Sequence, residues 1–499
     1  MSTSVLIVII ILLGAVSFFF RKKKNYPPGP LPWPIVGNLP LLRSLSRKFG
    51  GQDHALLELS CKYGSDLVAL RVGSNDLIAV SGQEAIQQVL HNEEYDGRPW
   101  NEFINLRNFG HKNGITFNDG PNWREMRAWL VKNLRVLGLG RRQMLDLMTQ
   151  ELNDILEKIK DGGVRNLSKI TAPAVINVLW TLTTGKKIDD TQRMLYFIDL
   201  MERRSQAFDM TGGILSALPW IKYIAPEKSG YNLLTQVNTE FKRFFMETIE
   251  EHKKNYTGKE QDDLINVFFK EMYSEANSDG LFNENELLII MMDLFIAGIT
   301  TTRTTLNFLF LNMIVNQDVQ ERLHQELDKV VGFGRSPDLN DRKRLPYTEA
   351  VLTESQRMCL VTPLIGPRRV LRETKLSGYT IPQESTMILN LTSIHMNPEY
   401  YSEPDIFKPE RFLQNGVYVP DKNLILFGEG KRRCPGEILA RCAIFLLFSG
   451  VMQRYRLLPD PGEEPPTLVC LPGLTISPKP YDALLIPRQA APSSVDLPN

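Results

Sequence analysis

The 499-residue chain has little cysteine and little histidine. Its cysteines are odd in number and scattered, and no two of them form a C-x-x-C pair: Cys61, Cys359, Cys434, Cys442 and Cys470. So few, unpaired cysteines are typical of a reduced, cytosol-facing chain in which one cysteine acts singly. The six histidines form no recognisable Cys/His motif, so no nucleophile with its general base is evident.

A charge excess, an internal repeat and a low-complexity linker are absent as well. The 58 basic and 57 acidic residues leave a net charge of +1, which argues against nucleic acid as a partner. Length alone suggests about three domains of roughly 150 residues each. Because no linker divides the chain, and 43% of it is hydrophobic, we expect one large folding unit.

The N-terminus contains a hydrophobic run. Residues 5–20 are almost purely apolar, and four basic residues follow at 21–24. With residues 2–4 the run has about 20 residues, near the length that spans a bilayer. A cleaved signal peptide has its charges before the run, and basic residues stay cytoplasmic. We therefore expect residues 1–24 to be a membrane anchor with its basic stop-transfer cluster; a buried core helix is the alternative.

Residues 25–40 are rich in proline, with five prolines between 27 and 34. Proline forbids helix and favours a stiff extended chain. This segment is expected to be a hinge that holds the catalytic body at a fixed tilt to the membrane, with a plain linker as the alternative. The body is then residues 41–499.

Periodicity in the rest of the chain predicts a mostly α protein with small β sheets, an α+β class. The expected elements are a hairpin over 66–80, helices from 83 to 330 with loops at 162–163, 212–213 and 277–280, strands near 367–390, a helix over 435–455 and short strands near 466–488.

One helix is unusual. Asn283 is a good N-cap, Glu286 three residues later completes a capping box, and apolar residues continue to about Val315. A helix of about 30 residues is roughly 45 Å long, and one this apolar is buried. At its middle stand Ala297-Gly298 and then threonines at 300, 301, 302, 304 and 305, although Gly and Thr are poor helix formers. A local rule broken in this way indicates a functional position.

The stretch LFGEGKRRCPGEILARC, residues 426–442, places one cysteine beside glycines and before an apolar helix. Pro435 suits the first turn of that helix, so Cys434 lies at a helix N-terminus, where free amides favour a thiolate. A thiolate can be a nucleophile or a metal ligand. A nucleophile needs a base that the sequence does not offer, whereas an axial ligand of haem iron needs none.

The spacing of Phe427, Gly430, Arg432, Cys434 and Gly436 resembles the haem-binding signature of the cytochrome P450 family. The resemblance extends over nearly the whole chain. It implies the fold of that family: a single catalytic domain over 41–499, with haem b (iron-protoporphyrin IX) between the long central helix and the cysteine loop. Cys434 would be the axial ligand, and the other four residues would surround the haem.

Other motifs agree with the resemblance. Glu354 and Arg357, three apart on one helix face, resemble the family's E-x-x-R, and Arg411 in PERF completes its buried network. Because a buried ion pair is costly unless satisfied, we interpret this trio as structural. The resemblance further implies a set of haem propionate partners, since arginine forms a rigid fork that fits carboxylates: Trp123 and Arg127 in WREMR, Arg98, Arg368 and Arg432.

In the long helix the family has Ala/Gly-Gly-x-Asp/Glu-Thr, and this chain has Ala297, Gly298, Ile299, Thr300 and Thr301. By resemblance, Ala297 and Gly298 lie beside the haem, the glycine lets the helix open, and Thr301 relays protons. Thr300 replaces the usual acid. A hydroxyl positions water but does not deliver a proton near neutral pH as a carboxylate does, so proton delivery is expected to be slower or to borrow another group.

The resemblance implies a monooxygenase that inserts one oxygen atom of O2 into a lipophilic molecule, with electrons from NADPH through a flavoprotein NADPH–cytochrome P450 reductase on the endoplasmic reticulum membrane. Candidate reductase contacts are Lys132, Arg135, Lys431 and Arg433. The substrate pocket would be lined, by family position, from residues 101–118, 203–215, 290–301, 362–367 and 472–477. These stretches are mostly apolar, which suits a terpenoid, fatty acid, steroid or lipophilic foreign compound.

Within the family the chain resembles animal microsomal second-clan members, including insect enzymes that epoxidise methyl farnesoate. Both hydroxylation and epoxidation are therefore considered. Two alternatives are a reductase-independent haem-thiolate isomerase or dehydratase and a haem-binding protein without enzyme activity. Thr301 favours the monooxygenase, because an enzyme that rearranges peroxides has no need of a proton relay.

Overall fold

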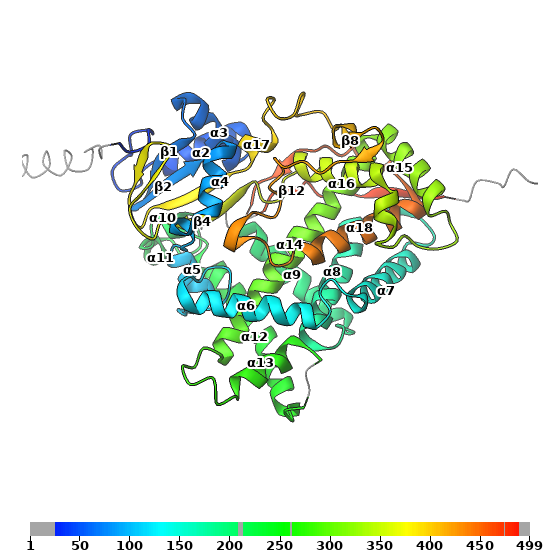
Figure 1. Cartoon of the computed structure of the whole chain (residues 1–499), viewed down its shortest axis with the longest axis horizontal. Helices are drawn as coiled ribbons and strands as arrows, with labels where there is room; N and C mark the ends of the chain where they lie inside the picture. Colours follow the sequence, from blue (N-terminus) through cyan, green and yellow to red (C-terminus); the bar gives the residue numbers. More distant parts are fainter. Residues whose placement is uncertain (1–24, 208–212, 260–261, 474, 489–499) are drawn as a thin grey trace, which may run out of the picture. The chain divides into compact units, whose positions relative to one another are not determined.

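The computed structural model describes residues 25–207, 213–259, 262–473 and 475–488. The expected membrane anchor, residues 1–24, lies outside this range. The chain divides into two compact units. Unit 1 consists of the described part of residues 1–99 together with 364–393, and unit 2 consists of residues 100–363 and 394–499. Figure 1 shows the elements of both units in sequence colours.

Unit 1 is built on a four-stranded sheet with the strand order β1-β2-β7-β4. Its strands are β1 (Leu67–Val72), β2 (Asn75–Val80), β7 (Thr386–Asn390) and β4 (Leu364–Arg369). β1 and β2 are antiparallel with Leu67 opposite Val80, so the hairpin predicted over 66–80 is confirmed. β2 and β7 are parallel, which brings two segments some 300 residues apart in sequence into one sheet.

The remaining elements of unit 1 are short. They are α2 (Leu39–Phe49), α3 (Gln52–Tyr63), α4 (Gln83–His91), a 3-10 turn (Glu93–Tyr95), β5 (Thr374–Leu376) and β6 (Tyr379–Ile381).

Unit 2 is mostly helical. Its helices are α5 (Glu102–Arg107), α6 (Gly120–Val136), α7 (Arg142–Lys158), α8 (Leu167–Thr184), α9 (Thr191–Ala207), α10 (Gly213–Ala217), α11 (Ile221–Ile224), α12 (Tyr231–Asn255), α13 (Leu264–Met272), α14 (Glu284–Val315), α15 (Gln317–Val330), α16 (Pro346–Met358) and α18 (Glu437–Arg454), with α17 (Thr392–His395) at its boundary. Its strands are β3 (Gly163–Arg165), β8 (Leu413–Gln414), β9 (Val417–Tyr418), β10 (Tyr455–Pro459), β11 (Cys470–Leu471), β12 (Ser477–Pro478) and β13 (Ala483–Pro487). The mostly α class with small sheets is confirmed.

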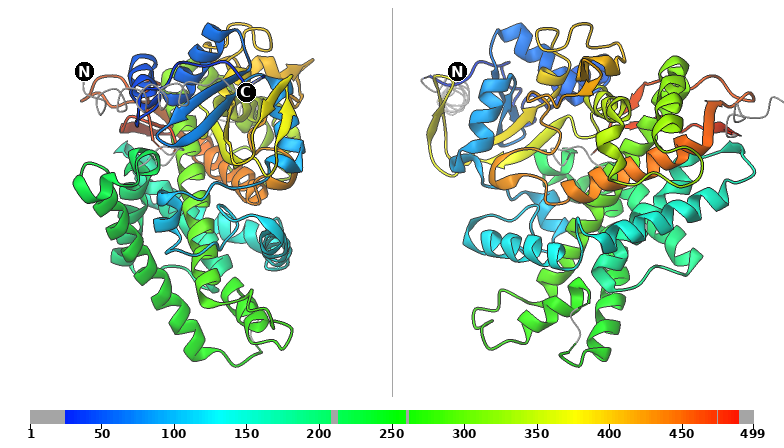
Figure 2. Two further views of the ribbon diagram at one scale, coloured as in Figure 1. Left: turned by 90° about the vertical axis from the view of Figure 1, so that its left-hand side faces the viewer. Right: turned by 45° about the vertical axis from the view of Figure 1, so that its right-hand side comes forward.

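Helix α14 forms the centre of unit 2 and packs against α8, α12, α16 and α18 (Figures 1 and 2). Aromatic side chains join three of these helices, because Trp180 and Phe245 both contact Phe295 of α14. Among the described residues, α14 alone is long and apolar enough to cross a membrane, but 61% of its most apolar window is buried in the protein. It is therefore a core helix, as predicted.

The cap of α14 differs in one respect from the prediction. The Asn283 side chain accepts a hydrogen bond from the Glu286 amide at 3.0 Å, as an N-cap does. The Glu286 carboxylate accepts from the Gly114 amide at 2.8 Å. Among the described hydrogen bonds, the Asn283 half of the expected capping box is present and the Glu286 half is not. The Glu286 carboxylate instead accepts from a buried backbone amide in a loop 172 residues earlier, an amide that would otherwise lack a partner.

Four strands were not predicted. Residues 162–163 were expected to be a loop, but Gly163–Arg165 is strand β3 and pairs with β13. β10 follows α18 directly and pairs with β13 on its other side, and β8 with β9 forms a two-stranded hairpin. Strands this short contain too few residues for a recognisable alternation of apolar and polar side chains. Their strand conformation depends instead on pairing with other segments.

Candidate functional site

The loop before α18 holds Cys434 in an exposed position. A 3-10 turn, Gly430–Arg432, precedes the cysteine, and the Cys434 amide donates to the Phe427 carbonyl at 2.9 Å. Gly428 and Gly430 have φ values of 66° and 69°, a region that disfavours other residues. A Cβ at Gly436 would lie 4.0 Å from the Cys434 sulfur. The glycines of this loop thus give it a tight path and keep the space near the sulfur clear.

The protein by itself does not stabilise the Cys434 thiolate. Surrounding protein atoms desolvate the thiol and raise its pKa above the usual value. The Gly436 amide is the largest influence in the opposite direction, and Arg127 and Arg433 also lower the pKa. The amide at the helix N-terminus thus favours the thiolate in the expected direction, but desolvation of the thiol outweighs it. A metal ion would change this, because a coordinating thiol is deprotonated outright.

Two arginines converge on one indole ring beside the cysteine loop. Arg432 lies 3.4 Å from the ring centre of Trp123, and Arg127 lies 5.9 Å from the same ring. Arg127 also donates to the Arg433 carbonyl. Trp123 is buried on α6, and its only N–H donates to the Ile115 carbonyl at 3.0 Å. The face of the indole ring therefore contacts the Arg432 guanidinium, and its N–H is hydrogen-bonded to Ile115 in the loop before α6.

Part of one face of α14 is open although most of the helix is buried. Ala297 is exposed, and Leu294, Gly298 and Thr301 are half-buried at helical spacing along the same side. The Thr301 hydroxyl donates to the Ala297 carbonyl at 2.6 Å. Thr300 is also half-buried, so both threonines of the predicted relay reach partly accessible surface.

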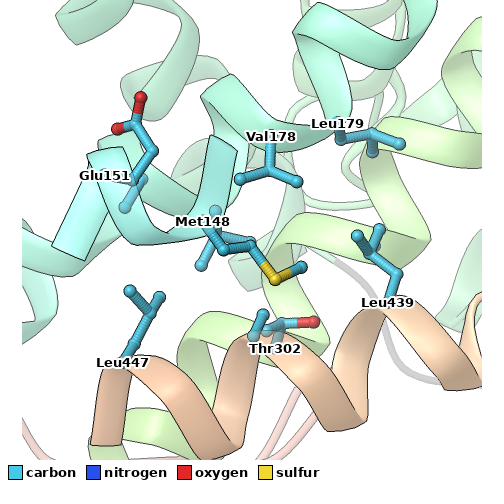
Figure 3. A pocket seen from close by; sticks show the side chains of 11 residues that line it. Met148, Glu151, Val178, Leu179, Thr302, Leu439 and Leu447 are labelled. Atoms are coloured by element: carbon cyan, nitrogen blue, oxygen red, sulfur yellow. The ribbon is translucent and has the colours of Figure 1, made fainter. Parts of the chain in front are cut away.

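Gly298 has a packing role rather than the predicted opening of the helix, since α14 is continuous from Glu284 to Val315. A Cβ at Gly298 would lie 3.2 Å from Leu179 of α8. Gly298 also lines a cavity of about 10 Å³ between α7, α8, α14 and α18, together with Thr302 and Met148 (Figure 3). A cavity of this size holds roughly one water molecule and excludes a substrate.

Glu354, Arg357 and Arg411 form one network. Arg357 donates to both Glu354 oxygens at 2.7 and 2.9 Å, and Arg411 donates to Glu354 at 2.9 Å. The side chains of Glu354 and Arg357 are 0% exposed. The remaining donors of Arg357 go to the carbonyls of His395 and Pro404, and those of Arg411 to the carbonyls of Ser402, Glu403 and Ile406. The network thus fixes the path of residues 395–411.

Arg98 and Arg368 belong to unit 1. Arg98 donates to the Pro367 carbonyl at 2.6 Å. Arg368, which is 1% exposed, forms an ion pair with Asp96 at 2.7 Å. These two arginines and Asp96 therefore connect β4 to the segment after α4 within that unit.

A second buried ionic cluster in unit 2 was not predicted. Arg107 of α5 pairs with Asp293 of α14 at 2.5 Å, and the side chains are 2% and 1% exposed. The other Asp293 oxygen accepts from the amides of Ile115 and Thr116 at 2.7 and 2.9 Å. A sequence signal did exist, because Asp293 is a lone charge inside an apolar helix, where a charge requires a partner.

The donor set of the cysteine loop fits a haem. Among the described residues no group of three or more His, Cys, Asp or Glu side chains gathers as a metal site, so Cys434 would have to bind its metal as a single protein ligand. A haem iron needs only such an axial thiolate. Arg127 and Arg432 beside the loop match the carboxylates that a haem carries.

Comparison with known proteins gives a consistent picture. The family model described as cytochrome P450 matches residues 27–485, which include parts of both units. The probable cytochrome P450 305a1 of Drosophila melanogaster is 38% identical over 481 residues, 93% of this chain and 94% of the relative. The farnesoate epoxidase of Bombyx mori is 35% identical over 471 residues, with shares of 93% and 94%. Cytochrome P450 2J2 of Homo sapiens is 31% identical over 474 residues, with shares of 93% and 92%.

Proposed function

This chain belongs to the cytochrome P450 family of monooxygenases, and on that premise we propose that it inserts one oxygen atom of O2 into a lipophilic small molecule, with NADPH as the electron source. The observation that carries the proposal is the loop around Cys434, which presents one exposed thiol between glycines in a chain that matches the family over residues 27–485.

We assign roles to the site residues on this basis. Cys434 is the axial ligand, in a loop shaped by Phe427, Gly430 and Gly436, and Arg127 and Arg432 bind propionates. Trp123 supports Arg432 through its ring face, and Arg98 and Arg368 are further propionate partners.

Bound haem supplies the activation of dioxygen at its iron. Ala297 keeps the open face of α14 free of bulk, and Glu354, Arg357 and Arg411 hold the loop path rather than act in catalysis.

Proton supply is assigned to Thr301, with Thr300 beside it. The Thr301 hydroxyl both donates and accepts, so it can hold a water molecule at the open face of α14. No carboxylate stands at position 300, and a second hydroxyl orders water without releasing a proton near neutral pH. Proton delivery therefore depends on ordered water.

The proposed electron donor is a flavoprotein NADPH–cytochrome P450 reductase. Lys132 and Arg135 of α6 and Lys431 and Arg433 of the cysteine loop are exposed, all within unit 2. Their charges suit an acidic partner surface, and charge pairs of this kind mainly raise the association rate. A Lys132→Glu, Arg135→Glu double variant should raise the KM for reductase and leave turnover by an organic peroxide unchanged.

The proposed location is the endoplasmic reticulum membrane, with a single-pass N-terminal anchor and the catalytic body in the cytosol. The support is the apolar run at 5–20 with its basic cluster. Deletion of residues 2–24 should transfer part or all of the protein from the membrane fraction to the supernatant.

The substrate class is a lipophilic molecule such as a terpenoid or a fatty acid. One relative carries the name farnesoate epoxidase, which makes a terpenoid epoxidation a specific candidate. Parts of the expected lining, 208–212 and 474, lie outside the described residues. Within the described parts, Phe103, Ile104 and Leu215 form one buried apolar cluster with Leu234, which suits an apolar ligand.

The decisive experiment has two steps. The reduced carbon monoxide spectrum of the purified holoenzyme should have thiolate character, and Cys434→His should abolish it while Cys61→Ser does not. With reductase and NADPH the enzyme should then consume O2 and form an oxygenated product from a terpenoid. Turnover of a lipid hydroperoxide without NADPH would support the isomerase alternative, and the absence of both activities a haem-binding protein.

A further inference from the structure

Arg204, in the last turn of α9, is a buried cation for which the described residues provide no carboxylate partner. The residue is 4% exposed. Its described hydrogen bond joins Nη1 to the neutral Asn238 side chain at 3.0 Å, and Nε has no partner among the described residues. No acid of the described chain lies within ion-pair distance. A buried charge of this kind is costly unless an anion pairs with it.

The acid whose charge acts on Arg204 already has other partners. Asp293 binds Arg107 through one oxygen and two backbone amides through the other. Arg107 is also a like charge, and burial together with Arg107 lowers the pKa of Arg204 to about 9. Arg204 therefore remains a cation at neutral pH while Asp293 serves another arginine.

The surroundings hold the guanidinium in a fixed position. Asn238 of α12 accepts from Arg204 and donates to the Leu106 carbonyl at 3.2 Å, so its amide is fixed at both ends. The guanidinium carbon lies 5.8 Å from the ring centre of Phe103. Phe103 and Leu106 border the apolar cluster with Ile104 and Leu215. One charged group is thus set beside a buried apolar cluster, which is the pattern of a site for an amphipathic ligand.

We propose that Arg204, supported by Asn238, binds the carboxylate of the substrate, so that the enzyme takes an apolar carboxylic acid in preference to its ester. Arginine is the residue suited to this, because its rigid fork forms two parallel hydrogen bonds to one carboxylate. This inference rests on the proposed function and specifies its substrate class.

The position also sets where the ligand is oxidised. Asp293, whose charge acts on Arg204, shares one face of α14 with Ala297 and Thr301. Eight residues separate Asp293 from Thr301, which is about 12 Å along a helix. If the carboxylate of the ligand binds near the Asp293 end of α14, the apolar tail of the ligand reaches the open face between Ala297 and Thr301. Oxidation is therefore expected on the part of the molecule remote from the acid.

The test measures binding to the full-length holoenzyme by calorimetry and by optical titration. Two acid–ester pairs are compared, farnesoic acid with methyl farnesoate and dodecanoic acid with methyl dodecanoate. The native enzyme should bind each acid roughly tenfold or more tightly than its ester, Arg204→Gln should remove this preference without weakening ester binding, and Arg204→Lys should retain part of it. Arg203→Gln is the matched control, because Arg203 is adjacent, more exposed and already paired with Glu240 at 2.7 Å.

An acid-to-ester affinity ratio near one in the native enzyme overturns the inference, as does an equal loss of acid and ester binding in Arg204→Gln. If Arg204→Gln does not fold, as judged by its carbon monoxide spectrum, the acid-to-ester affinity ratios of the native enzyme and of Arg204→Lys test the inference. The two proposals fail separately. Oxidation of acid and ester at equal efficiency would support the monooxygenase function and reject the Arg204 site. Acid-selective binding without any NADPH-dependent product would support the Arg204 site and reject the monooxygenase function.

Discussion

The Thr301 hydroxyl donates a 2.6 Å hydrogen bond to the Ala297 carbonyl one turn earlier in α14. Threonine in a helix often bonds in this way, and the bond fixes the direction in which the hydroxyl proton points. With its proton engaged, the hydroxyl has only its oxygen lone pairs left to offer, and Thr301 is half-buried on the same side of the helix as the exposed Ala297. The hydroxyl therefore accepts readily at the open face, and it donates there only by breaking the bond to Ala297.

Thr301→Ala should lower the yield of product per NADPH several-fold, because ordered water loses its anchor. Substrate affinity should change little. Thr305→Ala is the matched control, since the Thr305 hydroxyl makes the same kind of bond, to the Thr301 carbonyl at 2.9 Å. NADPH consumption, hydrogen peroxide and product are measured together. Equal yields in both variants would remove Thr301 from the proton path.

Thr300→Asp restores a carboxylate at a half-buried position of the same helix. We expect more product per NADPH and a higher ratio of hydroxylated to epoxidised product, because an acid delivers protons more readily than a hydroxyl does. The measurement is a product analysis on a substrate with both a C=C bond and an activated C–H bond. Unchanged yield and ratio would make Thr300 a neutral replacement.

Glu354→Gln should lower the free energy of unfolding by roughly 3–5 kcal/mol, because it leaves two arginines near or in the core without their shared carboxylate. Glu202→Gln is the control. Glu202 forms an ion pair with Arg303 and is 41% exposed, so its loss should cost less than about 1 kcal/mol. Urea denaturation of both variants measures the difference, and similar costs would contradict a buried network.

Glu286 should make stability depend on pH. Burial, with a smaller effect of Asp293, raises its pKa from 4.5 to about 7, although the Gly114 amide lowers it. Below pH 4.5 the group is protonated in both states. Between pH 4.5 and 7 only the unfolded chain releases the proton, so stability falls as pH rises, by up to about 3 kcal/mol, and this contribution is lost above pH 7.

Glu286→Gln should flatten the dependence of the urea midpoint on pH over that window. Glu284→Gln, on the same first turn but 36% exposed and paired with Lys253, should leave it unchanged. A native protein whose stability is constant from pH 5 to 7.5, or a Glu286→Gln variant that keeps the native slope, would contradict the assignment.

The sequence predicted those parts of the molecule that have a local cause. Asn283 and the apolar periodicity after it defined α14, and the turn at Gly73 defined the first hairpin. β3 was missed because its partner lies some 320 residues later, and three residues contain no period. The hydrogen bond of the Glu286 carboxylate to Gly114 was not predicted for a related reason, since it joins the helix to a loop whose position is set by tertiary packing.

The cysteine loop was the part of the site most open to sequence reasoning, because glycines and a proline mark it regardless of the rest of the fold. Arg204 was not found, since a single arginine in an amphipathic helix is normally solvated. Two structural facts distinguish Arg204: it is buried, and Asp293 is paired with Arg107 instead.

The pairing of β3 with β13 places a requirement on synthesis of the chain. Residues 163–165 leave the ribosome early and have to wait for residues 483–485 before their edge is covered. An uncovered strand edge is a template for aggregation, and this edge stays exposed while some 320 further residues are made. Strand β13 thus completes this sheet only after residues 483–487 have been made. A nascent chain that stops before residue 483 would retain the cysteine loop and all of α14, yet its β3 edge would stay uncovered, so the chain would be prone to aggregation and degradation.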